Sequence, residues 1–141
     1  LRAGGLTYFA NWITPKVEPR RFDARFYVAR APTGQVAEHD AKETTASAWM
    51  TPDDALSAYR AGDIQLAPPT WSILHDLRRL GTASEVMTWA AAVAPVPPIM
   101  PHITQHDGAL VLALPGDPLH ADEPGTAARR IVLRDGRWSS T

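Results

Sequence analysis

The residues best suited to chemistry lie in a polar stretch, residues 35–45, which carries the carboxylates of Glu38, Asp40 and Glu43. This stretch connects two segments predicted to be β-strands, so we expect it at the edge of a sheet. A carboxylate in that position can bind a divalent metal or position a water molecule. The alternative is a solvated loop with no chemical role, and charge alone favours that interpretation by about two to one.

Two adjacent arginines, Arg20 and Arg21, join the first two predicted strands, and Arg25 follows within the second strand. A guanidinium group can hold a phosphate through two parallel hydrogen bonds, so Arg21 is a candidate phosphate ligand. A basic turn in which Arg21 pairs with a nearby carboxylate is about equally favoured. Trp12 can stack on a planar ligand, although most tryptophans of this chain are expected to pack in the core.

Other combinations of residues that could support chemistry are weaker. His102 and His106 are four residues apart, but Pro101 and the turn-forming Asp107-Gly108 predict a strand or loop, where the two rings lie too far apart for one ion. A zinc site there has about one chance in twenty. The sequence contains no Walker loop, dinucleotide-binding glycine motif or nucleophile elbow. Cysteine is absent, which excludes disulfides and thiolate chemistry.

The composition is that of one globular domain. Of 141 residues, 45% are hydrophobic and 21% are charged, enough to bury a sizeable core. The net charge of −1 provides no basic excess for binding nucleic acid. The longest apolar stretch, residues 89–101, is too short and too rich in proline to cross a bilayer, and no signal-peptide pattern opens the chain. We therefore expect a cytoplasmic protein with no nucleic-acid or membrane partner.

The order of predicted elements is strands, then helices, then strands, which is typical of an α+β fold. Strands are predicted at residues 8–14, 22–29 and 46–50. Thr51 followed by Pro52 marks the start of a first helix, a second follows Pro68, and Thr82 with Glu85 has the capping-box spacing of a third. A proline-rich connector, residues 95–101, precedes two hairpin signals centred on Asp-Gly turns at 107–108 and 135–136.

Six segments, in this order, carry a family resemblance. They are Trp-Ile-Thr-Pro at 12–15, Arg-Arg-Phe-Asp-Ala-Arg-Phe-Tyr-Val-Ala at 20–29, Ala-Trp-Met-Thr-Pro-Asp-Asp-Ala-Leu at 48–56, Leu-Ala-Pro-Pro-Thr-Trp at 66–71, Leu-Pro-Gly-Asp-Pro at 114–118 and Leu-Arg-Asp-Gly-Arg-Trp at 133–138. Together they resemble the region after the Nudix box in Nudix hydrolases. The closest branch is that of the peroxisomal coenzyme A diphosphatases and their bacterial homologues.

The resemblance implies a Nudix-type mixed sheet sandwiched between helices, incomplete in this chain and extended by a C-terminal β-hairpin. Residues 1–94 would be the C-terminal portion of the Nudix domain, and residues 95–141 the connector and hairpin extension packed on it. The implied activity is hydrolysis of a diphosphate linkage in a nucleotide derivative, coenzyme A-like or another nucleoside diphosphate linked to a second group. Mg²⁺ or Mn²⁺ is the implied cofactor.

The resemblance also assigns roles to individual residues. Glu43, and second Glu38, would supply an accessory carboxylate that binds metal or activates water, while Arg21, Arg25 and Trp12 would contact substrate. The Arg-Glu and Glu-Glu pairs that define the Nudix box do not occur in this sequence. They are expected before Leu1, in an N-terminal remainder of the same protein, and the chain alone should be inactive.

Two other interpretations remain open. One is a binding or regulatory module that keeps the Nudix fold without catalysis. The other is an unrelated α+β domain whose similar segments are coincidences of packing. The family also makes a homodimer a reasonable assembly, with the C-terminal hairpin as an interface.

Overall fold

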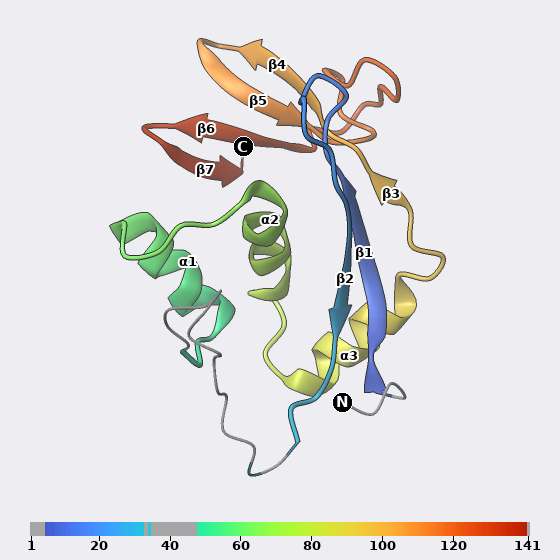
Figure 1. Ribbon diagram of the computed structural model, residues 1–141, viewed down its shortest axis with the longest axis vertical. Coiled ribbons are helices and arrows are strands. Elements are labelled where there is room, and N and C mark those ends of the chain that lie inside the picture. Colours follow the sequence, from blue (N-terminus) through green and yellow to red (C-terminus); the bar gives the residue numbers. More distant parts are fainter. Residues whose placement is uncertain (1–4, 33, 35–47, 141) are drawn as a thin grey trace.

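The computed structural model describes residues 5–32, 34 and 48–140, which form three α-helices and seven β-strands in two sheets (Figure 1). The elements are β1 (Thr7–Ile13), β2 (Asp23–Val28), α1 (Pro52–Ala61), α2 (Pro68–Leu77), α3 (Ala83–Ala92), β3 (Pro98–Ile99), β4 (His102–His106), β5 (Ala109–Ala113), β6 (Arg130–Arg134) and β7 (Arg137–Ser140). The predicted α+β class is confirmed. No helix in the described part of the chain is long and apolar enough to cross a membrane.

The first sheet has the order β2-β1-β3, with β1 antiparallel to β2 and parallel to β3. Trp12 pairs with Ala24, and Asn11 pairs with Arg25. Because side chains alternate between the two faces of a strand, Trp12 lies on the face opposite to Arg25. Exposed and half-buried residues alternate strictly along β2, as in a strand with one packed face. The strands predicted at residues 8–14 and 22–29 are confirmed, with each end within one residue of the prediction.

The three helices begin where the sequence predicts. The Thr51 side chain accepts the Asp54 backbone N–H at the start of α1, and Gly62 ends the helix in the left-handed conformation, with φ 95°. Thr82 and Glu85 form the predicted capping box of α3. These caps satisfy backbone groups that a helix end leaves unpaired, which is why short local motifs locate the starts of α1 and α3.

The short strand predicted at residues 46–50 is wrong for the part that the structure describes. Residues 48–50 have no regular structure, and the Trp49 side chain is 74% exposed. Aromatic residues favour strands only where a neighbouring strand and a packed face are available, and residues 48–50 pair with neither sheet.

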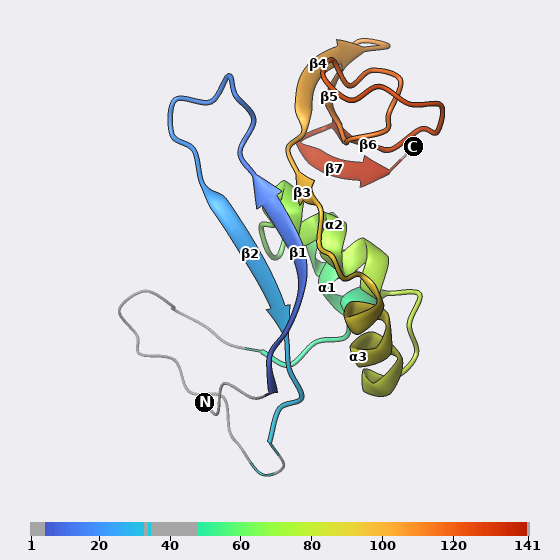
Figure 2. The same cartoon turned by 90° about the vertical axis from the view of Figure 1, so that its right-hand side faces the viewer.

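The second sheet has the order β4-β5-β6-β7 and is antiparallel throughout. Both hairpins turn at the predicted Asp-Gly pairs, with positive φ at Asp107 (50°), Gly108 (74°), Asp135 (48°) and Gly136 (72°). Such turns match the right-handed twist of the strands they join. The pairing of β5 with β6 makes one four-stranded sheet, larger than the hairpin extension expected from the sequence. Figure 2 shows this sheet at one end of the β1–β2 pair and α3 at the other.

A buried carboxylate organises the long loop between β5 and β6. Asp117 is fully buried and accepts hydrogen bonds from the backbone N–H of Leu119 (2.8 Å), the backbone N–H of Arg129 (2.6 Å) and Nε of Arg130 (2.8 Å). Burial alone would raise the pKa of Asp117, but these three donors outweigh it and hold the pKa below its ordinary value. The Leu-Pro-Gly-Asp-Pro segment noted in the sequence is therefore a structural anchor of the loop.

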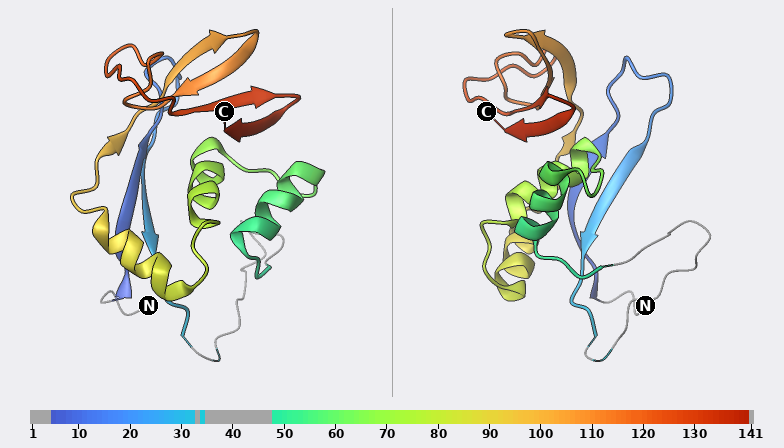
Figure 3. Two further views of the ribbon diagram at one scale, coloured as in Figure 1. Left: turned by 180° about the vertical axis from the view of Figure 1, so that it is seen from behind. Right: turned by 90° about the vertical axis from the view of Figure 1, so that its left-hand side faces the viewer.

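The second sheet is tied to α1. The Tyr59 hydroxyl, on a side chain only 2% exposed, accepts the backbone N–H of Trp138 on β7 at 2.8 Å. The Arg137 guanidinium lies 5.3 Å from the centre of the Tyr59 ring, a distance that suits a cation–π contact. Figure 3 shows α1 and α2 beneath β6 and β7 from behind. Tyr59 thus helps to hold β7 of the second sheet against α1.

We expect Asp117→Asn to destabilise the fold by about 2–4 kcal/mol at pH 7, because three donors lose a charged acceptor in a buried place. A carboxylate with a lowered folded-state pKa contributes stability above its ordinary value of 3.8, and this contribution is lost as the pH falls through the folded-state pKa. The difference between variant and wild type should therefore shrink below about pH 4 in denaturant unfolding. Asp122→Asn, at an exposed ion pair with Lys16, is the control and should change little. A difference in unfolding free energy between Asp117→Asn and wild type that does not depend on pH would contradict this account.

Tyr59→Phe should cost about 1–2 kcal/mol of unfolding free energy, because the part-buried N–H of Trp138 loses its acceptor. Denaturant unfolding followed by tryptophan fluorescence measures it. Tyr27→Phe, at a ring that is 50% exposed, is the matched control. Equal stability of the two variants would show that the hydroxyl does not hold the sheet.

Candidate functional site

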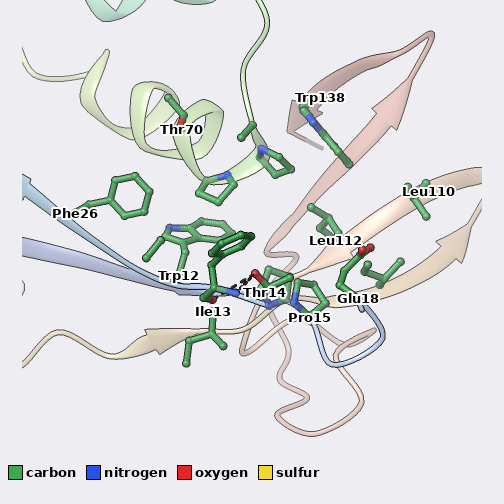
Figure 4. A pocket seen from close by; sticks show the side chains of 17 residues that line it. Trp12, Ile13, Thr14, Pro15, Glu18, Phe26, Thr70, Leu110, Leu112 and Trp138 are labelled. Carbon is green, nitrogen blue, oxygen red and sulfur yellow. Dashed lines mark hydrogen bonds between the residues drawn. The ribbon is translucent and has the colours of Figure 1, made fainter. Parts of the chain in front are cut away.

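A pocket of about 510 Å³ lies between the two sheets and the first turn of α2 (Figure 4). Trp12 and Phe26 contribute from the first sheet, Thr70 from α2, and Leu112 and Trp138 from the second sheet. The volume falls within the range of small-molecule sites. The full lining is Trp12, Ile13, Thr14, Pro15, Glu18, Phe22, Ala24, Phe26, Ala67, Pro68, Pro69, Thr70, Pro101, Ile103, Leu110, Leu112 and Trp138.

This lining is almost wholly apolar. Among the described residues it includes no lysine, arginine or histidine, and Glu18 is the one ionisable side chain. The Thr14 hydroxyl is already engaged, since it accepts the backbone N–H of Phe22 at 2.9 Å and lies 3.3 Å from the Phe22 carbonyl oxygen, to which it donates. A phosphate would lose its hydration here without gaining a positive partner, so the pocket suits an uncharged group.

Trp12, predicted to contact substrate, lies in this pocket. Its side chain is 4% exposed and belongs to the hydrophobic core, beside Phe26 and Leu112. The sequence allowed Trp12 either to contact a ligand or to pack in the core. Its position is compatible with both, because a buried indole can form the floor of a pocket while it packs in the core.

Arg21 is not part of the pocket lining. Its Nε donates to the Thr14 carbonyl oxygen at 3.2 Å, and its terminal nitrogen lies 3.5 Å from the Met100 sulfur. The guanidinium thus ties the connection between β1 and β2 to the segment that enters β4. Neither contact is the carboxylate pairing considered from the sequence.

Arg25 lies on the opposite face of the first sheet from the pocket and is exposed. Its cross-strand partner is Asn11, whose side-chain oxygen is buried and has no hydrogen-bond partner among the described residues. Tyr8 and Tyr27 pair on the neighbouring part of the sheet, with ring centres 5.3 Å apart. This face therefore carries Arg25 and the two tyrosines, whereas Arg21 lies in the connection between β1 and β2.

The two glutamates predicted to be catalytic, Glu38 and Glu43, lie outside the described residues. Within the described ranges, no group of three or more histidine, cysteine, aspartate or glutamate side chains could hold a metal ion. The described residues thus supply no such cluster, and the roles of Glu38 and Glu43 at a metal stay predictions.

The histidines of β4 do not form a site of the kind considered from the sequence. His106 is exposed and lies 3.4 Å from its neighbour Asp107. His102 instead faces the buried His120, with ring centres 6.1 Å apart. In His120, Nδ1 accepts the backbone N–H of Glu123 (2.9 Å), which leaves Nε2 to donate to the Met100 carbonyl (2.9 Å). Both ring nitrogens are thus used to hold the loop.

A family model described as the NUDT19 Nudix domain matches residues 4–80, more than half of the chain. The chain belongs to this Nudix family. The resemblance stated from the sequence is confirmed, and an unrelated α+β domain is ruled out. The matched region contains the first sheet apart from β3, together with α1 and α2, and it ends before α3.

Two curated relatives are similar over most of the chain. The acyl-coenzyme A diphosphatase NUDT19 of Xenopus laevis is 30% identical over 134 residues, covering 91% of this chain and 35% of the relative. The protein of the same name from Gallus gallus is 28% identical over 143 residues, covering 91% of this chain and 36% of the relative. The chain therefore spans about a third of the length of these relatives. No solved structure matches it significantly.

The contacts of the two arginines predict different effects on stability. Arg21→Ala should lower the unfolding free energy by about 0.5–1 kcal/mol, because the Thr14 carbonyl loses a donor. Arg25→Ala should stay within about 0.5 kcal/mol of wild type, as is usual for an exposed residue without special contacts. Denaturant unfolding of both variants measures this. If Arg25→Ala lowers the unfolding free energy more than Arg21→Ala does, Arg25 and not Arg21 is the arginine that stabilises the fold.

Proposed function

We propose that this chain is part of a Nudix hydrolase that cleaves the diphosphate linkage of a coenzyme A derivative. The observation that carries the proposal is its 30% identity, over 91% of the chain, to an acyl-coenzyme A diphosphatase. In the proposed reaction, water attacks one phosphorus atom and a phosphorus–oxygen bond of the diphosphate breaks. The products are two phosphate monoesters.

The two faces of the first sheet suit different parts of such a substrate. The pocket face has no positive charge and suits the uncharged part of such a substrate. The opposite face carries the exposed guanidinium of Arg25 beside Asn11, whose side-chain oxygen has no hydrogen-bond partner among the described residues. Since guanidinium groups bind phosphate oxygens in a planar, two-bonded geometry, we assign the phosphate contact to Arg25 and a positioning role to Arg21.

The cofactor in this proposal is Mg²⁺ or Mn²⁺, which would neutralise charge on the diphosphate and activate water. Glu43 is the proposed accessory carboxylate, with Glu38 as the second candidate. Both assignments rest on the resemblance of residues 35–45 to the loop that supplies such a carboxylate in Nudix enzymes.

Glu43→Gln in the intact protein should lower kcat by about a hundredfold, the scale of lost general acid–base assistance, with little change in KM. Arg25→Ala should instead raise KM, because it removes a contact present before and during the reaction. The measurement is phosphate-monoester release from coenzyme A and octanoyl-coenzyme A in the presence of Mg²⁺, with EDTA as a blank.

Glu38→Gln is the matched control for Glu43→Gln, because it removes the same charge from the same stretch. An unchanged kcat in Glu43→Gln would remove Glu43 from the site, and a loss confined to Glu38→Gln would exchange the two roles. Binding of octanoyl-coenzyme A without hydrolysis by the wild-type protein would replace the enzyme by the non-catalytic binding module.

A further inference from the structure

The apolar pocket is built from two parts of the chain that differ in their relation to the family. Trp12, Phe26 and Thr70 belong to the region matched by the Nudix family model, whereas Leu110 and Trp138 lie beyond its end at residue 80. We propose that this pocket binds the acyl chain of the substrate, and that the second sheet is the element that selects among acyl chains. This inference rests on the function proposed above.

The chemistry of the lining favours an alkyl chain over the other parts of an acyl-coenzyme A. The phosphates need positive partners, and the pocket lining contains none. A nucleotide base needs several converging donors and acceptors, because each polar edge buried without a partner weakens binding. Here the Thr14 hydroxyl is occupied by the backbone of Phe22. An alkyl chain has no polar group to satisfy.

The carboxylate of Glu18 adds a constraint on the charge of the substrate tail. Its carboxylate is the only charge among the lining side chains and belongs to an exposed residue. A substrate tail that ends in its own carboxylate would bring two negative charges together, which is unfavourable. The pocket therefore disfavours a tail whose own carboxylate lies near Glu18.

An exposed aromatic ring adjoins the pocket. Phe22 lines it while its side chain is 63% exposed. Apolar surface that is left in contact with water gains most from a ligand that covers it. An alkyl chain that enters between the two sheets would cover this ring, so Phe22 lies where the chain would enter.

The second sheet presents a continuous apolar face to the pocket. Leu112 pairs with Ile103 across β5 and β4, and both line the pocket together with Leu110. Val111, between the two leucines, points to the opposite face and is buried there. Figure 4 shows Leu110, Leu112 and Trp138 coming from strands of this sheet, across from Trp12 and Phe26. Substitutions on this face of the second sheet would alter the space for the acyl chain without changing residues 4–80, which the family model matches.

The test is a series of saturated acyl-coenzyme A substrates of increasing length, hydrolysed by the intact protein. Each methylene that enters the pocket should lower KM by about fourfold, until the space is filled. Leu110→Trp, which fills the space from the second sheet, should abolish this dependence of KM on acyl-chain length for the longer acyl chains. His106→Trp is the control, since it adds the same bulk to an exposed position on the other face of β4.

A second variant keeps the test decisive if Leu110→Trp does not fold. Ala24→Leu fills the pocket from β2, on the opposite side, and should shorten the longest chain that gains affinity. A terminal carboxylate on the acyl chain should cancel the gain in the wild-type protein. Glu18→Gln should restore part of it.

A binding measurement separates this inference from the proposed function. S-octanoyl and S-butanoyl pantetheine contain no diphosphate, and the fluorescence of Trp12 and Trp138 reports their binding. Hydrolysis of coenzyme A derivatives with a KM that ignores chain length, or that is unchanged in both filling variants, would overturn the inference and leave the proposed function intact. Absence of all hydrolysis would overturn the proposed function. In that case, tighter binding of the octanoyl than the butanoyl probe, lost in Leu110→Trp, supports the acyl pocket alone, and equal binding overturns it.

Discussion

The placement of the second sheet on the helices depends on the hydrogen bond from the Trp138 backbone N–H to the Tyr59 hydroxyl. It joins β7 to α1 at 2.8 Å, in a place where the tyrosine is almost wholly excluded from water. Trp138 also lines the pocket, and the first turn of α2 lines it from the side of the helices. The bond therefore sets the separation between the helices and the second sheet, and with it the width of the pocket.

Two further contacts join the connection between β1 and β2 to segments next to the second sheet. Arg21 connects the β1–β2 turn to Met100, and Lys16 pairs with Asp122 of the loop between β5 and β6. That loop is itself held by the buried carboxylate of Asp117. The exposed Lys16 pair contributes little by itself, so the buried groups carry the constraint. The pocket is consequently a product of tertiary contacts between segments far apart in the sequence.

The pleat of the first sheet divides the candidate chemistry into two environments. Trp12 lies on the apolar face of the first sheet, which lines the pocket, while Asn11 and Arg25 lie on the opposite face. A coenzyme A derivative is itself divided into a charged diphosphate part and an uncharged tail, so a protein that handles it needs both environments. In the proposed function, the region matched by the Nudix family provides the polar surface, and the added second sheet completes the apolar one.

The sequence by itself determined the family, the starts of the three helices, the first two strands and both Asp-Gly turns. These features depend on local chemistry: a Thr cap, a Gly in the left-handed region, or alternation along β2. It did not reveal that the two hairpins join into one sheet, because the β5–β6 pairing crosses a loop whose closure depends on Asp117. It also favoured a strand at Trp49, where no partner strand pairs with residues 48–50.

The candidate site shows the same division. Sequence alone selected Trp12, Arg21 and Arg25 by residue type, but only the tertiary structure placed the first in a pocket, the second in a structural tie and the third on the opposite face. Leu110, Leu112 and Trp138 carried no signal of their own, since apolar residues on a strand look alike whether they line a core or a cavity. What separates the two is the distance between packed elements, and that distance is set by contacts such as the one between Tyr59 and Trp138.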